Sequence, residues 1–371
     1  MSVTVNGSNG ITFNDGSSQT AAASPFGLKN RIINGDMRID QRNAGASVTP
    51  TATVYGLDRW KMGAPAASKY SFQQNAASVT PPVGFTNYLG ITSLSSYTIS
   101  STDTFLAFQF IEGYNTADLS WGTANAKTVT LSFWVRSSLT GTFGGCLGNG
   151  NATRSYPFTY TISSANTWEQ KTITIAGDTS GTWLTTTSIG IALYLGFGVG
   201  STYSGTAGAW ASAEYYGATG ATSVVGTNGA TWYITGVQLE VGSTATPFER
   251  RMYGTELNLC YRYYWQQAAN QSGTRPLGIG SYLLSSYIEW FAQFPVEMRA
   301  VPSLVSATVT DGYEIYRNGA ADQFNVVELG TATKNTAFLY NNAQISGTAG
   351  QSGSVYCRNT YASSVAFSAE L

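Results

Sequence analysis

The chain has 371 residues and almost no net charge, with 19 lysines and arginines against 20 aspartates and glutamates. It contains no histidine, which excludes Ser-His-Asp and Cys-His catalysis and histidine-ligated zinc. The near-zero charge argues against nucleic-acid binding, which depends on lysines and arginines that neutralise phosphates. No run reaches the roughly 18 apolar residues of a membrane span, so we expect no membrane insertion.

Uncharged residues supply most of the polarity. Charged residues make up 11% of the chain, whereas a typical globular protein has about 25%. Aromatic residues reach 13%, and together with the many threonines and 41 glycines they favour an all-β fold, since aromatic and β-branched side chains suit a half-buried sheet surface. Three widely spaced cysteines predict reduced thiols, with an intermolecular disulfide as the alternative: Cys146, Cys260 and Cys357.

Residues 1–28 form a separate opening segment. Alternating apolar positions at 3–5 and 10–13 predict two short strands, and Asp15-Gly16 is a turn signal. A strand pair this short cannot build its own core, so it must lean on a partner chain or a docking surface. The first ten residues have neither a basic nor an apolar stretch, and we therefore expect no signal peptide.

Strand patterns dominate residues 29–250. Residues 128–136, 168–175 and 231–241 alternate apolar and polar side chains. Glycine-, serine- and threonine-rich stretches at 144–153 and 200–229 are expected to be long loops. Strands of this kind, separated by long loops, predict one large β-sandwich or jelly-roll domain.

A short helical connector is expected over residues 251–267. Thr255 is placed to cap it, and apolar residues then follow at helical spacing: Leu257, Cys260, Tyr261 and Tyr264. Residues 268–371 return to strand patterns and predict a smaller C-terminal β-domain. Its expected strands are 282–296, 303–309, 312–317, 325–329, 337–340 and 354–368, with turns at Asp311-Gly312 and Asn318-Gly319.

Several motifs resemble bacteriophage tail-fibre and receptor-binding proteins that contain a carbohydrate-binding-module-like jelly roll. The stretch GITFNDG, followed by QT, is similar to the opening of such fibres, and NRIINGDM, DQR and DRW look like the entry to the jelly roll. The stretches TGVQLEVG and TPFER look like its closing strand, and YGTEL with RYY like the connector behind it. The matching residues are 10–16, 19–20, 30–37, 40–42, 58–60, 235–242, 246–250, 253–257 and 262–264, with 294–299 and 369–371 also similar.

This resemblance implies a virion fibre or appendage made in the host cytoplasm. Such proteins are usually homotrimers that attach to the phage tail or another virion protein by the N-terminal segment. They present a distal β-domain to a host-surface glycan or protein, and three linked weak sites gain avidity through effective concentration. The alternatives are a purely structural head, neck or tail appendage, a glycan-depolymerising tailspike and a secreted lectin-like module.

Candidate ligand-binding residues are aromatic side chains in loop-like stretches, because sugar rings stack on aromatic faces while nearby polar groups bind their hydroxyls. The alternative for each is a place in the core or in a subunit interface. In the jelly roll the candidates are Trp210, Tyr215 and Tyr216, beside Glu214. In the C-terminal domain they are Tyr313, Tyr316, Arg317 and Asp322.

Two glutamates are candidate calcium ligands. Glu112 and Glu240 lie in similar strand-like segments, and calcium prefers carboxylate and carbonyl oxygens. The family resemblance supports this, since carbohydrate-binding jelly rolls often hold a structural calcium; the alternative is two glutamates hydrogen-bonded to arginine or backbone. The remaining carboxylates are scattered and suggest no catalytic pair, so we expect a non-enzymatic protein without a cofactor other than this possible calcium.

Overall fold

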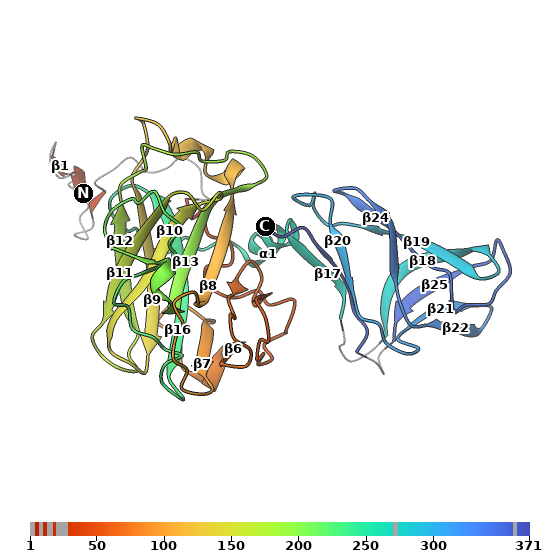
Figure 1. Ribbon diagram of the computed structural model, residues 1–371. Helices are drawn as coiled ribbons and strands as arrows, with labels where there is room; N and C mark the ends of the chain where they lie inside the picture. Colours follow the sequence, from red (N-terminus) through yellow and green to blue (C-terminus); the bar gives the residue numbers. More distant parts are fainter. Residues whose placement is uncertain (1–3, 7–9, 13–17, 20–28, 270–273, 359–361) are drawn as a thin grey trace.

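The computed structural model describes residues 4–6, 10–12, 18–19, 29–269, 274–358 and 362–371. At the N-terminus β1 (Thr4–Asn6), β2 (Gly10–Thr12) and β3 (Ser18–Gln19) pair as a small antiparallel sheet. The expected turn at Asp15-Gly16 lies outside the described residues. Two larger β-domains follow, with helix α1 between them (Figure 1).

The first domain is a sandwich of two antiparallel sheets, which confirms the all-β, jelly-roll prediction. One sheet has the order β11 (Ser155–Ile162), β10 (Gly141–Asn149), β13 (Ile189–Val199), β8 (Thr104–Glu112), β5 (Lys61–Met62) and β4 (Val54–Tyr55). The other has the order β12 (Glu169–Ile175), β9 (Val129–Ser137), β16 (Thr231–Val241), β7 (Leu89–Ser93) and β6 (Tyr70–Gln74). The short 3-10 helices are η1 (Ala76–Ser78), η2 (Gly113–Asn115), η3 (Ala117–Leu119) and η4 (Ser201–Tyr203).

Strand alternation builds the core between these sheets. In β9 the apolar residues Val129, Leu131, Phe133 and Val135 are fully buried, and they pack with Trp232 of the neighbouring β16. The strands predicted over 128–136, 168–175 and 231–241 therefore exist almost as expected. The alternation identified them because one side of each strand faces a dry interior.

The loop predicted over residues 144–153 is wrong for its first part, since residues 144–149 belong to strand β10. This strand pairs with both β11 and β13 although it is rich in glycine. A Cβ atom on Gly145 would lie 2.4 Å from the Phe158 ring and 2.6 Å from the Tyr194 carbonyl oxygen. Glycine is thus required here because neighbouring strands fill the space that a side chain would take.

The loop predicted over residues 200–229 is largely irregular, but it is not detached from the sandwich. It contains the short parallel pair β14 (Ser204–Gly205) and β15 (Gly217–Ala218). It lies against the outward face of β10 and β13, where Ala218 approaches Gly144 and Tyr216 packs on Tyr194. The outer face of that sheet is therefore partly covered by its own chain.

Helix α1 (Tyr253–Tyr261) lies within the predicted connector. The expected cap at Thr255 is wrong, since the helix begins two residues earlier and Thr255 falls in its first turn. The buried Glu256 instead binds the jelly roll, where its carboxylate accepts hydrogen bonds from the Asn34 backbone N–H and the Arg251 guanidinium. This anchors the helix to the first domain.

The C-terminal domain packs a large sheet against a small one. The small sheet has the order β17 (Tyr264–Ala268), β26 (Val365–Ser368) and β20 (Ser303–Ser306). The large sheet has the order β22 (Ala320–Phe324), β21 (Tyr313–Arg317), β25 (Ser352–Cys357), β18 (Arg275–Leu284), β19 (Tyr287–Gln293), β24 (Thr336–Asn341) and β23 (Glu328–Ala332). Since β17 is the first strand of this domain, the domain begins a few residues before the predicted position 268.

Three strand predictions in this domain need correction. The strand expected over 282–296 is a hairpin of β18 and β19, and that expected over 354–368 separates into β25 and β26. The strand expected over 325–329 lies later, as β23. The turn at Asn318-Gly319 is confirmed: both residues have positive φ, 49° and 78°, as the tight hairpin between β21 and β22 requires.

The two domains are joined by buried polar contacts as well as by the chain. Glu112 of β8 pairs with Arg262, and Glu370 near the C-terminus pairs with Arg42 and Arg59 of the first domain. All three cysteines are buried free thiols. Within the described part of the chain, no helix combines the length and hydrophobicity of a membrane span.

Candidate functional site

The seven-stranded sheet of the C-terminal domain has one open face. Its inner side carries the core residues Tyr313, Ile315, Trp290 and Leu339, which pack together with Phe367 of the small sheet. Because successive side chains on a strand point to opposite sides, the alternate residues of the same strands point outward. Several of those outward residues are large, apolar and exposed.

Four aromatic rings form a continuous patch on this open face. Phe291 of β19 lies 5.4 Å from Phe338 of β24, measured between ring centroids, and Phe338 lies 6.2 Å from Tyr340. Tyr340 in turn stacks on Tyr287, at 5.4 Å and an interplanar angle of 9°. Phe291 is 67% exposed although it lies in the middle of a sheet.

The patch continues across the sheet toward the β21 edge. Ile279 of β18 is 71% exposed, and its register partner on β25 is Ser354. Ser354 is in turn opposite Tyr316 of β21, which is 48% exposed. We call these six apolar residues the open-face patch: Ile279, Tyr287, Phe291, Tyr316, Phe338 and Tyr340.

Acidic groups border the open-face patch, and one of them, Glu314, forms an ion pair with Arg358 at 3.1 Å. Among the described strand residues, the outward positions hold Glu289, Glu314 and Glu328 but no lysine or arginine. A hydrogen bond to Glu328 raises the pKa of the Tyr340 hydroxyl. This face offers rings for stacking, while two of its three carboxylates are already engaged, Glu314 by Arg358 and Glu328 by the Tyr340 hydroxyl.

Of the candidates predicted in this domain, only Tyr316 lies on the open face. Tyr313 points inward and is fully buried, so its prediction as a ligand contact is wrong. Its hydroxyl donates to the backbone oxygens of Ala307 and Ser364, at 2.7 and 2.8 Å, and its ring stacks on Phe324. Tyr313 therefore serves the core.

Arg317 and Asp322 also lie away from Tyr316, on the inner side of the same hairpin. They form an ion pair at 3.7 Å, and Asp322 accepts a hydrogen bond from the Tyr282 hydroxyl at 2.5 Å. Arg317 lies over the Tyr282 ring and donates to the Ser346 backbone oxygen. These contacts fasten the β21–β22 hairpin to the adjacent loop and leave both side chains engaged.

Trp210 belongs to a packed cluster in the jelly roll. Its ring lies nearly perpendicular to those of Trp121 and Trp183, with centroids 5.4 Å away in each case. Each indole N–H donates to a backbone oxygen: Trp121 to Lys127, Trp183 to Ser180 and Trp210 to Ala176. Three tryptophans thus lock separate loops together.

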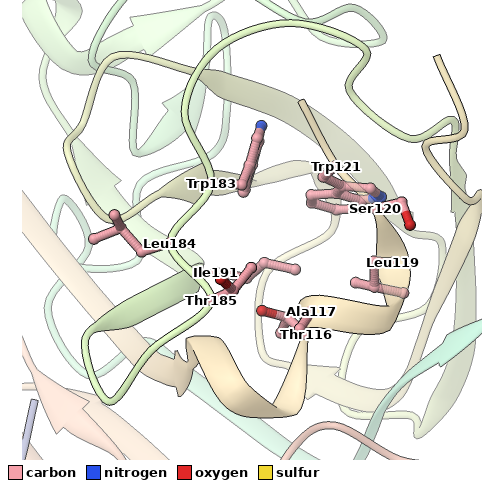
Figure 2. A pocket seen from close by; sticks show the side chains of 9 residues that line it. All are labelled: Thr116, Ala117, Leu119, Ser120, Trp121, Trp183, Leu184, Thr185 and Ile191. Atoms are coloured by element: carbon pink, nitrogen blue, oxygen red, sulfur yellow. The ribbon is translucent and has the colours of Figure 1, made fainter. Parts of the chain in front are cut away.

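A small pocket opens beside this cluster. Figure 2 shows Trp121 and Trp183 above residues of η3 and β13 that line it, including Leu119 and Ile191. Its volume is about 30 Å³, close to that of one water molecule. This pocket has no room for a sugar ring, and the structure gives Trp210 a packing role.

Tyr215 and Tyr216 pack onto the jelly roll from the covering loop. Tyr215 lies over Gly205, and Tyr216 packs on Tyr194 and Tyr203 with centroid distances of 4.7 and 5.1 Å. The Tyr216 hydroxyl donates to the Glu214 carboxylate. Both candidates are half-buried by these contacts.

The structure adds a row of rings that sequence reasoning missed. Tyr194 lies 5.6 Å from Phe108 of β8, and Phe108 lies 5.3 Å from Phe110. The signal was present in β8 and β13, where aromatic residues occupy the positions that alternate with the core residues. A second row of aromatic side chains thus runs along the outer face of the jelly roll, with Phe108 buried and Phe110 and Tyr194 half-buried.

Glu112 and Glu240 do not share a site. They lie on different sheets, and the Glu112 carboxylate accepts hydrogen bonds from Arg262 and from the Tyr263 hydroxyl at 2.8 Å. Glu240 accepts from Thr246 and Gln238. No cluster of three or more potential metal ligands occurs among the described residues. The shared calcium site is therefore wrong in its geometry, and calcium elsewhere stays a prediction.

Comparisons with known proteins find weak similarity to solved structures. No protein-family model and no curated protein match the sequence. A putative sugar binding protein from Bacteroides thetaiotaomicron is similar over 57% of this chain and 100% of its own, with 11% identity and a TM-score of 0.33. A family 11 carbohydrate-binding module from Clostridium thermocellum is similar over 53% of this chain and 97% of its own, with 11% identity and a TM-score of 0.24.

The enzymatically active domain of tailspike protein 4 from bacteriophage CBA120 is also similar, with 9% identity and a TM-score of 0.30. The match covers 58% of this chain but only 22% of the tailspike chain. At such identities and TM-scores these comparisons show nothing about the function of this chain.

Proposed function

We propose that this protein is a non-enzymatic adhesin, a bacteriophage fibre or appendage whose C-terminal domain binds a glycan or protein on a host surface. The open-face patch is the observation that carries the proposal. Soluble monomeric domains rarely leave contiguous apolar patches exposed, and such patches mark binding surfaces. Here the patch lies in the middle of a sheet, on the domain furthest along the chain.

The sequence motifs support the remaining parts of the proposal. The resemblance to phage fibres suggests attachment to the virion through residues 1–28 and assembly as a homotrimer. Three copies of the open-face patch on one particle would convert weak individual contacts into firm adhesion. A non-catalytic role is supported by the buried carboxylates Glu112, Glu240 and Glu256, each of which is engaged by hydrogen-bond donors.

A structural appendage is the second candidate function. The aliphatic residues Ile279, Leu283 and Leu284 are all more than half exposed. Aliphatic side chains suit a protein surface better than a sugar, so the same face would join copies of the chain or another virion protein. In that case the patch would serve assembly rather than host attachment.

Cell binding of the full chain tests the proposal. We expect wild-type protein to bind intact host cells and Phe291→Ser to bind at least tenfold more weakly, since that side chain is the exposed centre of the patch. Tyr114→Ser is the matched control, because Tyr114 is 61% exposed on the jelly roll, outside the patch. Unchanged binding by Phe291→Ser would overturn the proposed surface.

Two further measurements separate the alternatives. A structural appendage predicts no cell binding and a change of sedimentation in Phe291→Ser. A depolymerase predicts release of reducing ends from host polysaccharide by the wild-type protein. Either result would replace the adhesin proposal.

A further inference from the structure

A second site lies where the two domains meet. A cleft of about 480 Å³ opens between the jelly roll, helix α1 and strand β17, a volume within the range of about 300–1,000 Å³ typical of small-molecule sites. All three elements contribute neutral polar or aromatic side chains to its wall: Gln41, Gln74, Tyr253, Tyr261, Gln266 and Gln267.

Helix α1 supplies an aromatic wall. Tyr253, Leu257 and Tyr261 are spaced at i, i+4 and i+8, which places them on one face of the helix. All three line the cleft, and Tyr253 is 55% exposed. The adjacent side of α1 packs on the jelly roll, since Cys260 is buried against Ile33 and Ile39 and Leu257 packs against the same cluster.

The charged groups around the cleft are already engaged within the protein. Arg38 pairs with Asp36 at 2.5 Å, and it also donates to the Arg251 backbone oxygen. Asp40 accepts hydrogen bonds from backbone N–H groups of its own loop, and Arg275 is likewise not free. A charged ligand would have to compete with these contacts.

The neutral polar groups of the cleft, in contrast, can still form hydrogen bonds. The Tyr253 and Tyr261 hydroxyls and the Gln266 side-chain amide have no hydrogen-bond partner among the residues that the structure describes. The Gln267 amide nitrogen donates to the Leu277 backbone oxygen at 2.8 Å, but its buried side-chain oxygen has no partner in that same set. A buried acceptor without a partner is unfavourable, and a ligand hydroxyl nearby would relieve it.

We propose that this cleft binds a neutral saccharide. Its rings would contact the Tyr253 and Tyr261 side chains, and its hydroxyls would donate to and accept from the unpaired amide and phenol groups. A ligand held in this way touches both domains and the helix between them. The site is independent of the open-face patch, which lies on another sheet and keeps its own test.

The test uses the full chain and a panel of neutral oligosaccharides built from glucose, galactose or N-acetylglucosamine, followed by saturation-transfer NMR and calorimetry. We expect at least one panel member to bind the wild-type protein and Tyr253→Ala to weaken its affinity at least tenfold. Gln266→Ala should weaken it as well, which protects the test against a folding defect in one variant.

The matched controls are Tyr114→Ala and Phe291→Ser, which should leave this affinity unchanged because neither residue lines the cleft. The proposal is overturned if no panel member binds at millimolar concentration. It is also overturned if acidic oligosaccharides bind more tightly than neutral ones, or if the cleft variants behave like the controls. Loss of cell binding in Phe291→Ser with intact saccharide affinity would separate this site from the proposed adhesive surface.

Discussion

Glu112 shows how a single buried carboxylate ties the two domains together. Its side chain is 1% exposed, and both oxygens accept from the Arg262 guanidinium, at 2.7 and 2.9 Å, while the Tyr263 hydroxyl adds a third hydrogen bond. Burial alone would raise the pKa of Glu112, but the hydrogen bonds from Arg262 and Tyr263 outweigh it and hold the pKa below its ordinary value of 4.5.

Replacing Glu112 with glutamine should therefore destabilise the protein in a pH-dependent way. A lowered folded-state pKa means that the carboxylate stabilises the fold above about pH 4.5 and loses this contribution as the pH falls through the folded pKa. We expect Glu112→Gln to cost about 1–3 kcal/mol at pH 7 and the difference from wild type to shrink toward pH 3. Urea unfolding at both pH values measures this.

The exposed Asp118 is the control for that experiment. Its ion pair with Arg31 is on the surface, where such pairs contribute about 0–1 kcal/mol, so Asp118→Asn should cost less than Glu112→Gln at pH 7. An equal effect of the two substitutions, or a Glu112→Gln effect that grows at low pH, would contradict the role given to Glu112.

The tryptophan cluster carries a second prediction at this scale. Trp121 is 7% exposed and touches both Trp183 and Trp210, so its removal leaves a cavity and frees the loops that it joins. We expect Trp121→Ala to lower the free energy of unfolding by about 3–5 kcal/mol, against about 0.5 kcal/mol or less for the exposed Tyr114→Ala. A comparable small loss in both variants, measured by thermal unfolding, would rule out a structural role for the cluster.

At the scale of strands, prediction depended on whether apolar side chains alternate with polar ones along the strand. The sequence of β16 alternates and lies over a dry core, so its bounds were predicted correctly. The sequence of β10 predicts a loop because glycine has no side chain to alternate. Glycine is required there because Phe158 and the covering loop, which come from other parts of the chain, fill the space beside the strand. The local sequence pattern gives no information about such distant neighbours.

Two glycines provide a test of that explanation. In β10 a Cβ on Gly145 would meet the Phe158 ring at 2.4 Å, so Gly145→Ala should destabilise the jelly roll by about 1–3 kcal/mol through overpacking. In α1 a Cβ on Gly254 would meet nothing within 4 Å, and Gly254→Ala should stabilise by about 0.4–1 kcal/mol because alanine restricts the unfolded chain. Chemical denaturation of both variants checks the opposite signs. Two effects of the same sign would contradict the packing argument.

For the whole molecule, the strand patterns predict the all-β, two-domain architecture, but they do not predict the open-face patch. Tyr313 and Tyr316 lie on the same strand, three residues apart, and therefore on opposite faces. Which face is covered depends on β17, β20 and β26, and β26 lies far along the chain. The outward residues of β19 include Tyr287 and Phe291 beside Glu289 and Gln293, so aromatic residues occur on both faces of that strand and alternation does not single out the inner one.

A second buried contact between the two domains centres on Glu370, and it supplies the last prediction. Glu370 is 4% exposed and pairs with Arg59, which is 2% exposed, and with Arg42 at 3.0 Å. Removing one member of a buried ion pair leaves an uncompensated charge, so Glu370→Gln should cost about 3–5 kcal/mol. We expect calorimetry to show the two domains unfolding at more widely separated temperatures.

The control Glu297→Gln breaks an exposed pair with Lys334 and should cost about 1 kcal/mol or less. An unchanged unfolding profile in Glu370→Gln would mean that Arg59 is satisfied by its other acceptor, the Phe110 backbone oxygen, and that the domains are held by packing instead.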